Sequence, residues 1–203
     1  MSPKVSDTYK EERSAAILEV ALQCFAEKGY RSATIDDIAR KLGMSKGSIY
    51  LYFKTKEEIY TRIIQDRMRR TVKGIRSQYT DIEGAADKLH LVIQTFCDQN
   101  LEGLRFLLAF HLEFWLESSR RPELREVMEE QNETAITLLR DIVEEGIRTG
   151  EFRADVCPEQ AASLFWAARD GLALQFVGGG KESDYRERME GMEKMLLRYL
   201  VKI

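Results

Sequence analysis

The sequence predicts an all-α protein of about nine helices: a three-helix head that contains a helix-turn-helix, followed by a larger helical body. Three observations predict this class. Only 3 prolines occur in 203 residues, so few positions interrupt a helix. Apolar residues recur at helical spacing one segment after another, and strand patterns do not follow them. The chain is 44% apolar and 32% charged, which suits a packed core and excludes a disordered or fibrous chain.

The helices of the head are marked by residues that cap helix N-termini. A threonine or serine stands at each expected start: Thr8, Thr34, Ser45 and Thr55. The segments Thr8–Glu11 and Thr55–Glu58 have the spacing of a capping box. We expect Gly29 to end the first helix and the helix after Thr55 to run to about Gln78.

The body is expected to consist of five more helices. They cover about residues 83–99, 101–118, 122–149, 158–177 and 184–202. Pro122 and Pro158 stand in the first turn of two of them, where proline is tolerated. Gly150 is placed to end the longest helix, and three successive glycines at 178–180 form a short connector.

Charge divides the chain into two parts. Residues 1–75 hold 15 Lys or Arg and 10 Asp or Glu, whereas residues 76–203 hold 16 and 24. A basic front on an acidic body favours a head that binds a polyanion. We therefore expect a DNA-binding domain over residues 1–54 and a ligand-binding and dimerisation domain over residues 55–203.

Residues 35–53 have the pattern of a helix-turn-helix. Ala39 is a small residue where two short helices must cross, and Gly43 tolerates the positive φ of the turn between them. Ile49 and Phe53, four residues apart, anchor the second helix against the first. The alternative is a plain helical hairpin without DNA-binding function.

The second helix of this motif presents a polar outer face. Lys46, Gly47, Tyr50 and Lys54 point away from its apolar anchors, and Ser48 lies on the flank. Donors and a bare glycine near a helix N-terminus suit entry into the major groove of duplex DNA.

Here the sequence resembles the TetR family of bacterial repressors. The head carries the resemblance over about residues 10–60, through Phe25, Gly29, Thr34–Ala39, Gly43, Gly47, Ile49–Phe53 and Lys54–Glu58. The body resembles the effector domain of the choline-responsive repressor branch, through Phe114–Trp115, Pro122–Arg125, Gly150–Phe152, Pro158–Glu159 and Asp170–Leu172. The resemblance implies a sequence-specific DNA-binding repressor that an apolar small molecule releases from its operator.

The resemblance also implies which residues contact DNA. Base contacts are implied for Lys46, Gly47, Ser48 and Tyr50. Phosphate contacts are implied for Thr34, Tyr52 and Lys56, and Ser45 at the start of the second helix completes the expected DNA-binding set. One short recognition helix offers few base contacts, so we expect a homodimer on a palindromic operator with half-sites about one helical turn apart.

Three polar residues on apolar stripes of the body predict an effector cavity. They are His111, Gln131 and Arg169, and the aromatic residues expected to line the same cavity are Phe110, Phe114, Trp115 and Trp166. The alternative is ordinary core, with His111 and Gln131 bonded to backbone and Arg169 paired with Glu113. An anionic group on the ligand is expected if Arg169 faces the cavity, whereas Glu113 and Glu117 could serve a cation.

The last helices predict the dimer face. Apolar residues recur there at helical spacing: Met189, Met192, Leu196, Tyr199 and Ile203. With Leu172 and Ala173 in the preceding helix, they could form a four-helix interface with a second copy. The alternative is that the last helix only covers its own core.

Other classes find little support in the sequence. No run of 18 apolar residues indicates a membrane span, and the N-terminus does not read as a signal peptide. Three cysteines without metal-ligand spacing indicate reduced thiols, so we expect a cytosolic protein without metal or cofactor. Two alternatives remain: an enzyme with an appended DNA-binding head, and a DNA-binding regulator controlled by a protein partner. The helix from Thr55 to Gln78 is expected to be the only element that touches both head and body.

Overall fold

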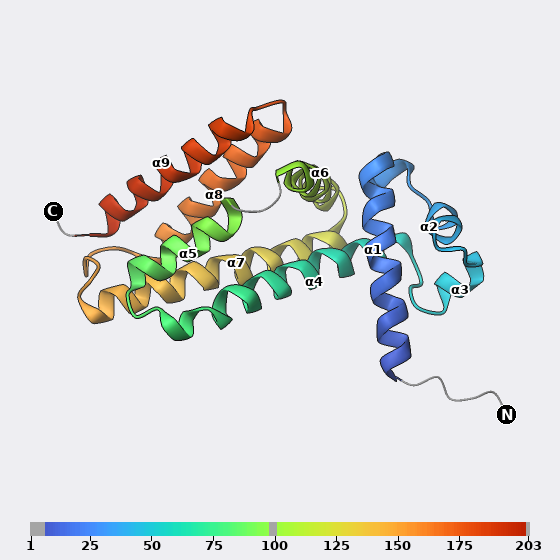
Figure 1. The fold of residues 1–203 in the computed structure, drawn as a ribbon, viewed down its shortest axis with the longest axis horizontal. Helices are drawn as coiled ribbons and strands as arrows, with labels where there is room; N and C mark the ends of the chain where they lie inside the picture. Colours follow the sequence, from blue (N-terminus) through green and yellow to red (C-terminus); the bar gives the residue numbers. More distant parts are fainter. Residues whose placement is uncertain (1–6, 98–100, 202–203) are drawn as a thin grey trace.

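The computed structural model describes residues 7–97 and 101–201, and over these ranges it is all-α (Figure 1). The helices are α1 Asp7–Ser32, α2 Ile35–Leu42, α3 Lys46–Tyr50, α4 Lys56–Ser77, α5 Ala85–Cys97, α6 Leu101–Ser118, α7 Pro122–Thr149, α8 Pro158–Val177 and α9 Glu182–Leu200. The sequence did not predict the 3₁₀ turn at Tyr79–Asp81. Residues 98–99 and 202 of the expected helices lie outside the described residues. The predicted fold class is confirmed.

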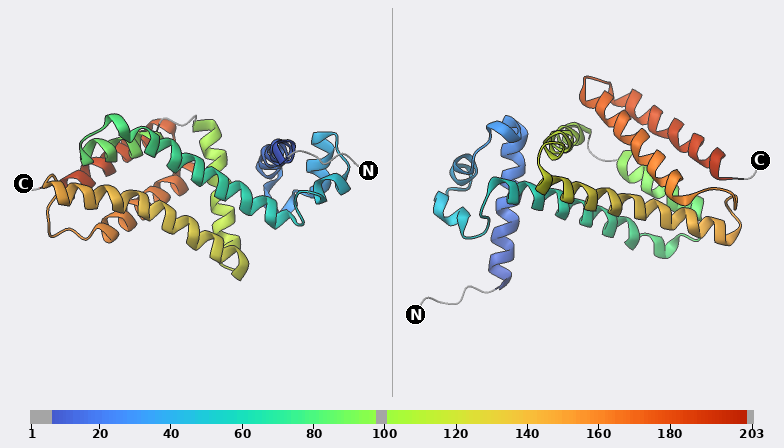
Figure 2. Two further views of the ribbon diagram at one scale, coloured as in Figure 1. Left: turned by 90° about the horizontal axis from the view of Figure 1, so that it is seen from below. Right: turned by 180° about the vertical axis from the view of Figure 1, so that it is seen from behind.

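The head and the body occupy opposite ends of an elongated molecule. In Figure 1, α1 stands across the direction of α4 and α7, with α2 and α3 beyond it. The helices α4 and α7 run alongside each other through the body, and α5, α8 and α9 cover one side of that pair (Figure 2). The helix α6 packs against α1, α7 and α8, and so lies where head and body meet.

Local signals set most helix ends where the sequence places them. Thr34 caps α2 through a complete capping box with Asp37, and Gly43 ends α2 at φ 64°. Ser45 and Thr55 each accept a backbone N–H as the N-caps of α3 and α4. The capping box expected at Thr8–Glu11 does not mark the start of the first helix. The helix α1 begins at Asp7, so Thr8 is its second residue and not its N-cap.

Two apolar cores hold the molecule together. The head core joins residues of α1, α2, α3 and α4 to Phe110 and Phe114 of α6 and to Leu124 and Met128 of α7. The body core joins the far end of α4 to α5, α7, α8 and α9. The first half of α4, including Ile59, therefore packs within the head core although it follows residue 54.

The structure corrects part of the expected dimer face: most of the apolar residues named for it are buried in the chain's own core, whereas Tyr199 is 41% exposed. Met189, Met192 and Leu196 are buried in the body core, with at most 9% of their surface exposed. Ala173 is buried as well, and Leu172 packs partly against the same core. Helical spacing of apolar residues shows that a face is covered, but a chain's own core covers it as readily as a second copy does. Ile203 lies outside the described residues.

Within residues 7–97 and 101–201, no helix is both long and apolar enough to span a membrane.

Candidate functional site

The outer face of the helix-turn-helix is open to a partner. Tyr50 on α3 is 45% exposed. A Cβ on Gly47 would meet only the Ser45 hydroxyl, at 3.8 Å, so internal packing does not require a glycine there. Lys46 is also exposed, and its Nζ lies 2.7 Å from an Asp36 carboxylate oxygen on α2. An exposed pair of this kind is weak enough to exchange the carboxylate for a DNA group.

The expected hydroxyl contacts already have a structural role. The Thr34 hydroxyl donates to Asp37 at 2.7 Å and accepts the Asp37 backbone N–H at 3.2 Å. The Ser45 hydroxyl accepts the Ser48 backbone N–H at 3.1 Å, and the two serine hydroxyls lie 2.8 Å apart. Both capping sets lie at the surface, where DNA can share them. Tyr52 packs partly against the head core.

Lys56 lies differently from the expected phosphate ligand. Its ammonium donates to the backbone carbonyls of Tyr30, Arg31 and Ala33, at 2.7, 3.2 and 3.0 Å. It also lies 4.4 Å from the centre of the Tyr30 ring. Burial lowers the pKa of Lys56. The ammonium therefore caps the C-terminal end of α1, where carbonyls lack intrahelical partners.

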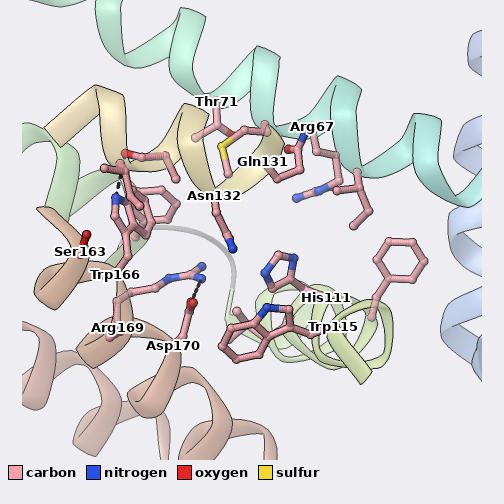
Figure 3. Close-up of a pocket in the computed structure, with 18 residues that line it drawn as sticks. Arg67, Thr71, His111, Trp115, Gln131, Asn132, Ser163, Trp166, Arg169 and Asp170 are labelled. Atoms are coloured by element: carbon pink, nitrogen blue, oxygen red, sulfur yellow. Dashed lines mark hydrogen bonds and ion pairs between the residues drawn. The ribbon is translucent and has the colours of Figure 1, made fainter. Parts of the chain in front are cut away.

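The body contains a partly open cavity of about 290 Å³ between α4, α5, α6, α7 and α8 (Figure 3). Six of the residues expected to line it are brought together there: Phe110, His111, Trp115, Gln131, Trp166 and Arg169. Phe114 does not line it, which corrects the expectation. Its fully buried ring lies 5.1 Å from the ring of Tyr60, in the head core. One face of α6 therefore lines the cavity, and the adjacent face of the same helix packs in the head core.

The contribution of α4 to this cavity was not predicted. Its lining residues are Ile64, Arg67, Met68 and Thr71, and further polar groups come from Asn132, Ser163 and Asp170. A signal for α4 exists in the sequence, because Ile64 and Met68 continue the helical spacing of the buried Ile59 and Ile63 toward Ile75. Arg67 lies beside this stripe and is exposed.

The polar groups of the cavity are only partly satisfied. Arg169 pairs with Asp170 at 2.7 Å, not with Glu113 as the alternative proposed. The indole N–H of Trp166 donates to the Ala135 carbonyl at 2.8 Å. Burial, and secondly the charge of Arg169, lower the pKa of His111 to about 4, so its imidazole is neutral at neutral pH.

The helix α6 connects the cavity to the head. Phe110 lines the cavity and also stacks on Phe25 of α1, with ring centres 5.9 Å apart. The Tyr60 hydroxyl of α4 donates to the Phe110 carbonyl at 2.7 Å. Head and body are therefore joined through α6 as well as α4, which corrects the expectation that α4 alone touches both.

Two acidic residues of α6 complete this connection. Gly29 interrupts α1 at φ 76°, and Glu113 accepts the backbone N–H of Tyr30 just beyond it at 2.8 Å. Glu117 pairs with Arg31 at 2.7 Å. These contacts engage Glu113 and Glu117 with α1, so they are not the groups that would receive a cationic ligand.

Metal ligands do not gather in the part of the chain that the structure describes, where no three His, Cys, Asp or Glu side chains could hold one ion. Cys24 and Cys97 are buried and Cys157 is exposed, and none of the three forms a disulfide.

Comparisons with known proteins match both parts of the chain. Residues 17–63 match the model of bacterial regulatory proteins of the tetR family, and residues 85–203 match the C-terminal domain of BetI-type transcriptional repressors. The HTH-type transcriptional regulator YfiR of Bacillus subtilis is 30% identical over 176 residues, which cover 85% of this chain and 83% of the relative.

Solved structures show the same fold. The fatty acid regulator FadR of Bacillus subtilis, in complex with stearoyl-CoA, is 26% identical with a TM-score of 0.80, covering 91% of this chain and 98% of that one. A transcriptional regulator of Saccharomonospora viridis, in complex with choline, is 23% identical with a TM-score of 0.81, covering 95% and 100%. The chain therefore belongs to the TetR family of bacterial regulatory proteins and is a ligand-responsive, DNA-binding transcriptional repressor.

Proposed function

We propose that this repressor binds a palindromic operator as a homodimer and leaves it when a mostly apolar small molecule fills the body cavity. The observation that carries the proposal is the double role of Phe110, which lines the cavity and packs in the head core. A ligand that displaces this side chain acts directly on the packing of α1. The protein would bind DNA and its effector in the bacterial cytosol, without a catalytic role.

Base reading is assigned to α3. Gly47 allows close approach, Tyr50 supplies an exposed hydroxyl and ring, and Lys46 can exchange Asp36 for a base edge or phosphate. Five residues form this helix, so one copy reads only a short stretch of DNA. A second copy, related by two-fold symmetry, doubles the contacts on half-sites about one helical turn apart.

The dimer face is assigned to exposed apolar residues on α8 and α9. Leu164 and Leu174 on α8 are exposed, as is Met195 on α9, at 69%. Small exposed residues also occur on these helices: Ala167, Ala168, Gly171 and Gly191. Small residues let helices approach closely, and two helices from each copy can then pack as a four-helix interface.

Effector release follows from differential binding to two conformations. A ligand that fits better when the two recognition helices are set apart from the operator spacing lowers DNA affinity, and DNA weakens ligand binding by the same factor. The complex of the related FadR with stearoyl-CoA supports a ligand with a large apolar part. The contacts of α6 with α1 provide the physical connection between the two sites.

The DNA-binding proposal is tested by selecting duplexes from a random library with the full chain and measuring affinities at fixed salt. We expect a palindrome, and we expect Tyr50→Ala to weaken the selected duplex about tenfold or more while random DNA changes little. A selected site without two-fold symmetry, or a Tyr50→Ala variant with unchanged affinity, contradicts the proposal.

The dimer is tested by sedimentation of a Leu164→Glu, Leu174→Glu double variant. Charges at these positions cannot be desolvated in an interface, so we expect monomers. Leu51→Glu is the matched control, because Leu51 is an exposed leucine on the head. An intact dimer in the double variant places the interface elsewhere.

A further inference from the structure

The charged groups around the cavity do not balance. Arg169 and Asp170 form a pair, whereas Arg67 lines the same cavity with no hydrogen-bond or ion-pair partner among the described residues. Burial lowers the pKa of Arg67, and the positive charge of Arg70 lowers it further. The cavity therefore carries one uncompensated positive charge at its edge, on a side chain that is also open to solvent.

A buried polar atom in the cavity wall also lacks a partner. Gln131 is 4% exposed, and its Oε1 has no hydrogen bond. Buried polar atoms are normally satisfied, so such an atom in a cavity indicates a bound group or water that completes it. The Gln131 amide can present oxygen or nitrogen to a ligand by rotating its terminal torsion.

Two of the aromatic rings that line the cavity, Phe96 and Trp166, already face a cation of the protein. The Arg169 guanidinium lies 5.1 Å from the centre of the Phe96 ring and 5.9 Å from that of Trp166. Quaternary ammonium groups are recognised by such faces, which here face a cation belonging to the protein. A second cation beside Arg67 and Arg169 would be repelled.

The remaining walls are apolar. Ile64, Met68, Leu108, Ala135 and Ile136 contribute carbon surface from three helices. The exposed Trp115 and Asn132 lie at the rim, where a longer ligand can leave the cavity.

From these observations we propose that the effector is an amphiphile with an anionic head group, carboxylate or phosphate, that Arg67 binds while the apolar chain fills the cavity. The inference rests on the proposed function for its regulatory meaning, but not for the binding itself. Arg67 supplies the charge-assisted hydrogen bonds, and Gln131 completes the polar end of the site.

The test uses probes with the same chain and different head groups: decanoate, decyl phosphate, decanol and decyltrimethylammonium, all below their micellar concentrations. The chain has 2 tryptophans, Trp115 and Trp166, and both line the cavity, so intrinsic fluorescence reports binding at this site. We expect at least one anionic probe to bind about tenfold or more tightly than decanol, and the cation to bind more weakly than either anion. The two anionic arms distinguish a carboxylate from a phosphate ligand.

Variants of α4 assign the selectivity to one residue. Arg67→Gln is expected to remove the preference for the anion and leave decanol binding unchanged, and Arg67→Lys to keep most of it. Arg69→Gln is the matched control, because Arg69 pairs with Asp66 at 3.5 Å and does not line this cavity. If Arg67→Gln does not fold, the head-group series on the wild type and Arg67→Lys still decides the question.

Binding of decanol or the cation as tightly as the anions overturns the inference, as does undiminished anion binding by folded Arg67→Gln. Operator release is measured separately. If an anion binds through Arg67 and leaves operator affinity unchanged, the head-group inference stands and the release function fails. If decanol releases the operator as well as decanoate does, the release function stands and the inference fails.

Discussion

The DNA-binding head and the effector cavity differ in how their polar groups are satisfied. In the head, hydroxyls cap helices, Asp36 pairs with Lys46, and Lys56 occupies three carbonyls at the end of α1. In the cavity, the Gln131 Oε1 has no hydrogen-bond partner, and Arg67 has no ion-pair partner among the described residues. A surface read by DNA can be complete before its partner arrives, because exposed bonds exchange readily. A buried atom in a cavity wall needs its contact from the ligand or from water.

Adjacent residues of α6 give the largest contrast between these regions. Phe114 is fully buried in the head core, and Trp115 is 43% exposed at the cavity rim. We expect Phe114→Ala to lower the free energy of unfolding by about 3–5 kcal/mol and Trp115→Ala by about 1 kcal/mol or less. Urea unfolding of both variants measures this difference. Equal losses would show that the rim is packed as tightly as the head core.

His111 gives the stability of the cavity a pH dependence between about pH 6.5 and pH 4. The unfolded chain binds a proton there below about pH 6.5, whereas the folded chain binds it only near pH 4. The free energy of unfolding should therefore fall as the pH is lowered through this window, by up to about 3 kcal/mol. Unfolding of wild type and His111→Gln between pH 7 and pH 4.5 checks it. Parallel curves for the two proteins would show that His111 is not the group responsible.

Lys56 tests whether a basic residue of the head acts on DNA or on the fold. Its three carbonyl contacts predict that Lys56→Ala lowers the free energy of unfolding by about 1 kcal/mol, a modest loss because the site is half-exposed. The dependence of DNA affinity on salt should stay unchanged. Lys54→Ala is the control, with an exposed side chain. A salt slope smaller by about 1 in Lys56→Ala, with normal stability, would make Lys56 a phosphate ligand after all.

The smallest effect on stability is expected at the surface pair of Asp36 and Lys46. Asp36→Asn should change the free energy of unfolding by less than about 0.5 kcal/mol. It should strengthen DNA binding, because the carboxylate no longer competes for the Lys46 ammonium at 2.7 Å. Anisotropy titrations with the selected duplex measure the gain. Weaker DNA binding would mean that Asp36 positions Lys46 for its base contact.

The sequence correctly predicted the helix ends and turns that depend only on residues close together in the chain. The capping box at Thr34 and the positive φ of Gly43 are local requirements that the residue types reveal. The cavity depends on how five helices pack together. The sequence of α4 predicts where this helix begins and ends, but not that Arg67 lines the cavity. Phe114 and Phe110 are four residues apart on α6, and only the packed structure shows that one faces the head alone.

The dimer face shows the same limit from another side. Met192 and Leu196 have the spacing of an interface, but they cover the body core, while Leu164, Leu174 and Met195 remain exposed. Spacing along one helix contains no information about which neighbour covers it.

Phe110 also constrains how this protein can acquire new effectors. Residues of α7 and α8 in the cavity wall, such as Ile136 and Ser163, are remote from the head core, so mutation there can alter ligand preference without altering the DNA head. A mutation of Phe110 alters both at once. Evolutionary diversification of the ligand should therefore concentrate on α7 and α8, and Phe110 should be among the slowest cavity positions to change.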